Sequence, residues 1–348
     1  MTSSDVSDTL PVASASDAAV KMHDIVVIGA SAGAVPSLKV LVRGLPGNFP
    51  GSIFVTVHMS AEARSELSGI LSRAGSLPVS APADMTPIES GQIYVSSPDC
   101  HMLLERDRVR IVRGPKENRH RPAIDPLFRS AAWAYGPRVV GIVLTGYLDD
   151  GTAGLWAIKT CGGITIVQDP ADALHLDMPQ NALMHNRVDY CVPLDEMAAL
   201  LVKLATEPVD LTRHHPRPAS VKTEVEFASI ERDRDIDDMG SLGRLSPFTC
   251  PSCRGALWEL QEGDLMRYRC HTGHAFSEKS LLTEQSISIE EALYAALKAV
   301  EEKAAALRKL SQRWSERFPQ MEADYQARVS ELDASARVLR RLLANGTT

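Results

Sequence analysis

The 348-residue sequence has no apolar run approaching the 18 residues of a membrane-spanning helix, so no membrane insertion is expected. Its six cysteines are too few for a disulfide-stabilised scaffold. Positive charge is not in excess, because 37 basic residues face 44 acidic residues and the net charge is −7. This balance argues against a general nucleic-acid binder, and no nucleic-acid partner is expected. The first residues also lack the basic start and apolar centre of a secretion signal, which predicts a cytoplasmic protein.

The hydrophobic fraction of 44% is sufficient for a buried core, and the composition changes along the chain. Length alone allows one large domain and one or two small modules. The predicted parts are a disordered tail (1–22), a large α/β domain (23–205), a linker (206–246), a small module bearing cysteine and histidine (247–282), and a helical hairpin or coiled coil (283–345).

Short β-branched runs alternate with helical patterns in the large domain. The clearest runs are DIVVIG (24–29), SIFVTV (52–57), VVGIVL (139–144) and GITIVQ (163–168). Continuous apolar runs of this length are typical of parallel strands that are covered on both faces. The alternation predicts an α/β fold with a doubly wound, mostly parallel sheet of Rossmann-like topology. Residues 78–114 differ and predict an antiparallel hairpin at its edge.

The first predicted strand ends in a G-x-S-x-G turn at residues 29–33, and a helical pattern follows. Small residues on both sides allow a sharp turn that exposes the hydroxyl of Ser31 as a nucleophile. A dinucleotide-binding loop is an alternative, although position 34 is alanine and the second strand ends in His58 rather than in an acidic residue. Tight packing without function is a third interpretation. The local pattern alone leaves these three open.

His58 follows the second strand, and the adjacent acidic residues Asp149 and Asp150 follow the strand at 139–144. The carboxyl ends of parallel strands open at the same edge of a sheet, where ligands bind. Each residue alone has a structural interpretation, such as a turn or a helix cap. Together with Ser31 they indicate a nucleophile, a base and an orienting carboxylate.

Over residues 24–203 the sequence resembles the catalytic domain of the CheB-type chemotaxis protein-glutamate methylesterases. The matching segments occur in the same order and are IGASAGA (28–34), VTVHMS (55–60), IYVSSPDCHM (93–102), RPAIDPLFRSAA (121–132), LTGYLDDGTAG (144–154) and DMPQNA (177–182).

The resemblance implies a serine carboxylic-ester hydrolase that cleaves glutamate methyl esters on methyl-accepting chemoreceptors or related methylated proteins, with glutamine deamidation as a related activity. It places the nucleophile on Ser31, the base on His58 and the carboxylate on Asp150. It also places the oxyanion hole on the backbone N–H groups of Ala32 and Tyr147. No cofactor is expected for catalysis.

Family members commonly carry a receiver domain before the catalytic domain, and only 22 residues precede it here. We therefore expect the C-terminal region to dock the enzyme onto a partner or to form a homodimer through its helices. An alternative is a non-catalytic chemosensory interaction scaffold that uses the C-terminal modules to bind partners.

A second motif lies in the small module, where Cys250 and Cys253 form a CxxC pair and Cys270 precedes His274. Three cysteines and one histidine suit a structural zinc ion. The wider turn at Gly273 favours His274 over His271 as the fourth ligand. A reduced, metal-free loop is the alternative.

The remaining cysteines and histidines lack metal spacing. We expect buried thiols at Cys100, Cys161 and Cys191, and surface or loop positions for His101, His120, His175 and His185.

Overall fold

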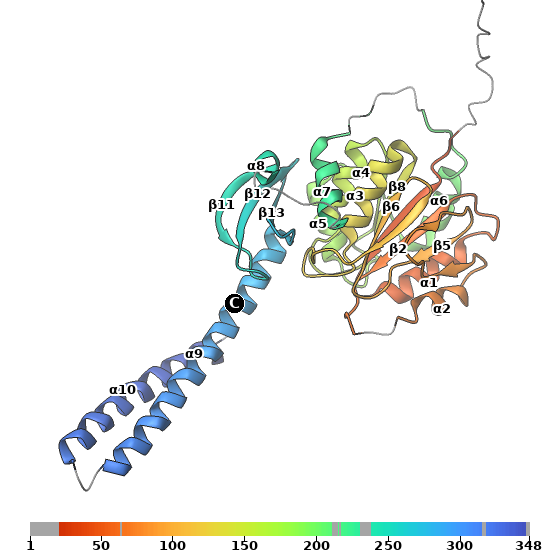
Figure 1. Ribbon diagram of the computed structural model, residues 1–348. Coiled ribbons are helices and arrows are strands. Elements are labelled where there is room, and N and C mark those ends of the chain that lie inside the picture. Colours follow the sequence, from red (N-terminus) through yellow and green to blue (C-terminus); the bar gives the residue numbers. More distant parts are fainter. Residues whose placement is uncertain are drawn as a thin grey trace, which may run out of the picture.

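The computed structural model describes residues 21–62, 65–210, 215, 217–229, 238–314 and 318–345. All but the last two positions of the expected tail (1–22) lie outside the described residues. Figure 1 shows an α/β domain, a small sheet beside it, and two long helices that extend away from both. Among the described helices, none is both long enough and apolar enough to cross a membrane.

A seven-stranded sheet forms the centre of the α/β domain, and all neighbouring strands are parallel. In spatial order the strands are β10 (Tyr190–Val192), β9 (Ile164–Gln168), β8 (Val139–Val143), β1 (Ile25–Ala30), β2 (Ser52–Val57), β5 (Ile93–Val95) and β3 (Val79–Ser80). Every residue of β1, β2 and β8 is buried, which explains their continuous apolar runs. The expected α/β fold with a mostly parallel sheet is confirmed.

Helices cover both faces of this sheet, and each face has its own apolar core, because alternate side chains of a strand point to opposite faces. One face carries α1 (Ala34–Gly44), α2 (Leu67–Ser72) and α6 (Leu194–Leu204), and the other carries α3 (Ile124–Tyr135), α4 (Thr152–Thr160) and α5 (Asp177–His185).

Strand β1 lies between β2 and β8, so the strands that follow it in sequence are added on both of its sides. Its last residue, Ala30, is in register with Val57, the last residue of β2. The next residues, Ser31 and His58, therefore begin neighbouring loops. Ligands of open α/β sheets bind at such a switch point.

A separate antiparallel sheet packs on α3 rather than extending the edge of the main sheet. Its strands are β4 (Thr86–Pro87), β7 (Arg108–Val112) and β6 (His101–Glu105), and a short 3₁₀ helix at Gly136–Arg138 precedes β8. Within residues 78–114, only β6 and β7 form an antiparallel hairpin; β5, which was expected to be one of its strands, belongs to the main parallel sheet.

The expected linker, residues 206–246, contains helix α7 (Ala219–Ser229), which packs against α3. Val221 and Phe227 are buried, and so is the carboxylate of Glu224. A buried carboxylate interrupts the apolar periodicity by which a helix is recognised, and for that reason the helix was not expected from the sequence.

The C-terminal part consists of a short helix, an antiparallel sheet and two long helices. In chain order the elements are α8 (Asp238–Leu242), β11 (Arg244–Thr249), β12 (Ala256–Glu262), β13 (Leu265–Cys270), β14 (Ala275–Ser277), α9 (Glu278–Trp314) and α10 (Pro319–Ala344). Helices α9 and α10 pack against each other, and Arg308 pairs with Asp333 between them at 2.5 Å.

Candidate active site and metal cluster

Ser31 lies in the turn between β1 and α1, and its side chain is half-buried. Its N–H donates to the carbonyl oxygen of Thr145 at 3.0 Å, which ties the turn to the loop after β8. Gly33 has a φ of 79°, and a Cβ at this position would lie 3.0 Å from Thr145 Oγ1. Glycine is therefore favoured both by the backbone conformation and by the available space.

His58 connects the serine to a carboxylate. Its Nδ1 lies 3.1 Å from Ser31 Oγ, and its Nε2 lies 2.6 Å from Asp150 Oδ2. The side chains of His58 and Asp150 are only 6% and 2% exposed. When Nε2–H donates to the carboxylate, Nδ1 is left to accept the serine proton. The structure thus brings together the three residues that the sequence placed at one edge of the sheet.

The carboxylate of Asp150 is buried and accepts several hydrogen bonds. Its Oδ2 accepts from Ile124 N at 2.7 Å, and its Oδ1 accepts from Asn118 Nδ2 at 2.9 Å and Gly151 N at 3.0 Å. Burial opposes ionisation, but these bonds and the one to His58 hold the pKa of Asp150 below its usual range. The group is therefore a fixed anion that orients the imidazole.

The expected oxyanion-hole residues, Ala32 and Tyr147, lie in the two loops that flank Ser31. Thr145 Oγ1 donates to the carbonyl oxygen of Ala32 at 3.0 Å and holds the loops together. A Cβ on Gly146 would lie 2.8 Å from Ser31 Cβ, so this loop closely approaches the serine. Neither the Ala32 nor the Tyr147 N–H donates to another described protein group.

Asp149 points away from His58. Its Oδ1 accepts a hydrogen bond from Ser277 Oγ at 2.7 Å, and its carbonyl oxygen accepts one from Thr152 N at 3.1 Å. Burial is the main cause of the raised pKa of this carboxyl. The adjacent aspartates therefore face different partners, and only Asp150 touches the imidazole.

Two residues at the site were not expected from the sequence. The ring of His120 is stacked on that of His58, with centroids 3.6 Å apart and planes 8° apart. The side chain of Asn118 contacts Asp150, as described above. Both belong to the irregular segment between β7 and α3, where no periodicity indicates which way a side chain points.

Three expectations about isolated residues were wrong. His101 is fully buried rather than at the surface, because its Nε2 donates to the carbonyl oxygen of Pro115 at 2.8 Å and its Nδ1 accepts from Ala123 N at 3.2 Å. Both ring nitrogens are therefore satisfied inside the protein. Cys191 is exposed and Cys100 is only partly buried, whereas Cys161 is buried as expected.

The model of the CheB methylesterase family matches residues 26–201. The chain belongs to this family. The matched CheB region contains Ser31, His58 and Asp150 and ends before α7 and the C-terminal sheet.

Curated proteins similar to the CheB region include one from Leptospira interrogans, named as a candidate protein-glutamate methylesterase/protein-glutamine glutaminase. It is 34% identical over 183 residues, which cover 52% of this chain and 95% of that protein. A protein-glutamate methylesterase/protein-glutamine glutaminase 2 from Rhizobium johnstonii is 35% identical over 178 residues, covering 50% of this chain and 48% of that protein.

Among solved structures, the CheB methylesterase catalytic domain of Thermotoga maritima is similar to this chain. The sequence identity is 30% and the TM-score is 0.50, and the match covers 52% of this chain and 98% of that domain. This share is close to that of the family model, which ends before the C-terminal sheet and helices.

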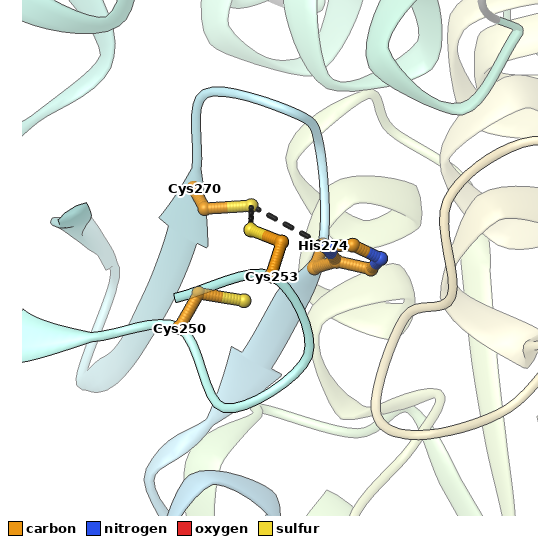
Figure 2. Close-up of side chains that lie close together, drawn as sticks. All are labelled: Cys250, Cys253, Cys270 and His274. Carbon is orange, nitrogen blue, oxygen red and sulfur yellow. Dashed lines mark hydrogen bonds between the residues drawn. The ribbon is translucent and has the colours of Figure 1, made fainter. Parts of the chain in front are cut away.

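The cysteine and histidine residues of the small module form a cluster, shown in Figure 2. One potential ligand atom from each of Cys250, Cys253, Cys270 and His274 lies within 4.8 Å of the others. The Sγ atoms of Cys253 and Cys270 are 3.6 Å apart, and Cys270 Sγ lies 3.5 Å from His274 Nδ1. Tetrahedral zinc, with bonds of about 2.0–2.3 Å, requires ligand separations close to these values. The donor set therefore fits a closed structural zinc site.

Two tight turns bring these ligands together. In the first turn, Cys250 N donates to the carbonyl oxygen of Gly255 at 2.7 Å. In the second turn, Gly273 has a φ of 100° and donates from its N–H to the carbonyl oxygen of Cys270 at 2.8 Å. His271 is not part of the cluster in the described part of the chain.

Proposed function

We propose that this chain is a protein-glutamate methylesterase that uses Ser31 as nucleophile, His58 as general base and Asp150 as orienting carboxylate. The observation that carries the proposal is the continuous chain of contacts from Ser31 Oγ through His58 to Asp150, at 3.1 Å and 2.6 Å. Family membership and the names of the relatives support the same activity.

The reaction begins when His58 Nδ1 takes the proton of Ser31 and the serine oxygen attacks the ester carbonyl carbon. The collapse of the tetrahedral intermediate breaks the bond to the methoxy group, and the imidazolium returns its proton so that methanol leaves. Water then attacks the acyl-enzyme with the same base and releases the glutamate carboxylate and Ser31. Asp150 keeps Nε2 protonated and stabilises the imidazolium throughout.

The backbone N–H groups of Ala32 and Tyr147 would hold the oxyanion that forms at the ester carbonyl. Each such donor contributes about 3 kcal/mol to transition-state stabilisation in hydrolases where one has been removed. The close approach of Gly146 to Ser31 supports this role, because it holds the second loop near the reacting carbon.

The same site would also deamidate glutamine side chains. An amide carbonyl offers the same geometry as an ester, and ammonia replaces methanol as the leaving group when His58 donates its proton. The names of the relatives include the glutaminase activity.

A hollow of about 440 Å³ lies beside the triad and has room for an extended substrate side chain. His58, Lys116 and Arg119 are among its lining residues. We propose methyl-accepting chemoreceptors or related methylated proteins as the substrates, as the family and the names of the relatives support.

We assign structural zinc to Cys250, Cys253, Cys270 and His274, and no cofactor to the catalytic step. The metal would supply a tetrahedral crosslink between the loop after β11 and the turn before β14. The small sheet needs such a link because, among the described residues, its apolar cluster has six buried members, and two of these are the ligands Cys250 and Cys270.

The paired helices α9 and α10 are proposed to dock the enzyme on its partner, with self-association into a dimer as the alternative use of the same surface. Exposed apolar side chains on α9, including Ile289 and Tyr294, support an interaction role.

The direct test is the release of methanol from methylated receptor membranes by the purified full chain. Ser31→Ala should abolish release, because it removes one half-buried oxygen that accepts the acyl group. Ser335→Ala, on the exposed face of α10, is a matched control and should keep the wild-type rate. Equal release by Ser31→Ala and wild type would exclude the assignment.

A further inference from the structure

We propose that the C-terminal zinc module positions the catalytic triad through Asn118, so that metal bound at the cysteine cluster sustains activity without touching the substrate. This inference rests on the proposed function for the roles of the triad residues. The zinc module is defined here as the sheet β11–β14 with the first turn of α9.

Asn118 is the direct link between the two parts of the chain. Its Nδ2 donates to Asp150 Oδ1 and to Asp125 Oδ2, both at 2.9 Å. Its Oδ1 accepts from Ser277 N at 3.0 Å and from Ser280 Oγ at 3.2 Å. One buried amide thus joins the triad carboxylate to Ser277 and Ser280 at the start of α9.

The module also fixes the backbone around this amide. Asn118 N donates to the carbonyl oxygen of Ala275 in β14 at 2.8 Å. Asn118 and Arg119 have φ values of 47° and 76°, a conformation that asparagine tolerates but that costs free energy for arginine. Contacts with β14 therefore stabilise a strained turn. The next residue is His120, whose ring covers His58, so the turn touches two of the three triad residues.

Buried ion pairs hold the module against the α/β domain. Arg269 of β13 contacts Glu117 and Glu224 at 2.8 Å, and Arg267 contacts Glu224 at 2.7 Å. Arg129 of α3 also pairs with Glu117. These side chains are at most 1% exposed, so each depends on its partners for its charge to be tolerated.

The metal ligands are continuous with these contacts. Arg269 directly precedes the ligand Cys270, and its Nη1 donates to the carbonyl oxygen of Gly273 at 2.7 Å. The ligand His274 directly precedes Ala275, which pairs with Asn118. The turn that a metal would hold closed therefore carries one residue of the ion-pair cluster and leads into the strand that supports Asn118.

Loss of metal would therefore loosen the turn at residues 270–274 and the strand β14 that follows it. Because Asn118 is hydrogen-bonded to β14, the turn at Asn118 would loosen as well. The orientation of Asp150 and His58 would relax without any change in Ser31. Misplacement by about 1 Å in a catalytic group lowers rates by up to about 100-fold. Asn118 is accordingly a positioning residue rather than a catalytic residue.

The experiment compares the zinc-loaded full chain with the same chain after a zinc chelator. The first readout is the rate at which a fluorophosphonate labels Ser31, and the second is hydrogen exchange in peptides that cover residues 116–120. Chelation should slow labelling by about 10- to 100-fold and speed exchange in this segment, while β1 and β2 stay protected. Added zinc ion should restore both.

Variants separate positioning from general stability. In Asn118→Ala, Ser31 should be labelled slowly with or without zinc, because this substitution removes the amide that joins the zinc module to Asp150. Asn186→Ala, which removes another part-buried amide of the same domain, should label at the wild-type rate and remain sensitive to chelation. If the metal-free chain unfolds throughout, Ser280→Ala tests the link separately. This variant keeps the four metal ligands but loses the hydrogen bond to Asn118 Oδ1, so Ser31 should still be labelled several-fold more slowly than in wild type.

Three results would overturn the inference: wild-type labelling by the verified metal-free chain, wild-type labelling by Asn118→Ala, or freshly purified protein that contains no metal. All three leave the proposed esterase activity standing as long as labelling requires Ser31, although the third would also remove the zinc assignment. If Ser31→Ala is labelled as fast as wild type, the proposed function itself fails, and that result is independent of metal content.

Discussion

The imidazole of His120 lies parallel to that of His58, 3.6 Å away between ring centroids. Two protonated imidazoles at this distance would repel each other, so the pair favours a neutral His120. Burial, followed by the neighbouring His58, lowers the pKa of His120 to about 3. The stacked ring thus covers the base without competing with Asp150 for its proton.

This pair predicts how stability depends on pH. Between about pH 3 and pH 6.5 the unfolded chain binds a proton at His120 that the folded chain does not, so this residue contributes stability that is lost as the pH falls through that range. His120→Phe should reduce the slope of unfolding free energy against pH by up to about 1.4 kcal/mol per pH unit. Urea unfolding between pH 4.5 and pH 7.5 measures the slope. Parallel curves for the two proteins would contradict the assignment.

Substitutions of the adjacent residues Asp149 and Asp150 should have very different effects on the turnover rate. Asp150→Asn should reduce turnover of a small activated ester by up to about 10⁴-fold, because the imidazole is no longer held in the required tautomer. Asp149→Asn is the matched control, since the new amide oxygen still accepts from Ser277 Oγ. Its loss should stay below about tenfold. The opposite ranking would place the orienting carboxylate one residue earlier.

Metal content is a third prediction. Purified protein should hold about one zinc per chain, because three thiolates and one imidazole complete a closed tetrahedral site. Cys253→Ser should lose the metal and lower the melting temperature. Cys191→Ser removes an exposed thiol outside the cluster and should retain the metal. Elemental analysis of the three proteins gives the answer, and zinc in Cys253→Ser at the wild-type ratio would argue for a different ligand set.

The buried ion pairs predict a large effect of one substitution. Arg269→Gln should reduce the free energy of unfolding by about 3–5 kcal/mol, because Glu117 and Glu224 lose a buried partner. Arg244→Gln is the same change on the same sheet, but its side chain is 85% exposed and should contribute less than about 1 kcal/mol. Urea unfolding of both variants measures the difference. Similar losses would show that the cluster is not specially stabilising.

The meeting of Ser31 and His58 could be predicted from the sequence because it follows from strand geometry. Two apolar runs that pair in parallel place the residues after them side by side, and the register of Ala30 with Val57 does so here. The choice between Asp149 and Asp150 does not follow from that geometry, because both lie in one loop. The family resemblance indicated Asp150, which is the aspartate that contacts His58.

The support of the triad could not be predicted in the same way. Asn118 and His120 lie in an irregular segment whose side-chain directions depend on contacts with β14, far away in sequence. From the sequence alone, Glu224 is expected to be a solvated charge, whereas in the structure it pairs with Arg267 and Arg269. Long-range pairing of polar groups leaves no periodic pattern in the sequence, so the interface between the α/β domain and the zinc module could not be predicted.

Helix α9 begins at Glu278, and its first turn contacts Asn118 beside the triad through Ser280. The helix continues for 37 residues away from the α/β domain, as Figure 1 shows. At a rise of about 1.5 Å per residue, its far end lies about 55 Å from its first turn. A partner held at that end would be kept at a fixed reach from the esterase centre. Such an arm would select glutamate esters by their distance along the partner as well as by their local sequence, and shortening α9 and α10 by whole turns would move the preferred position accordingly.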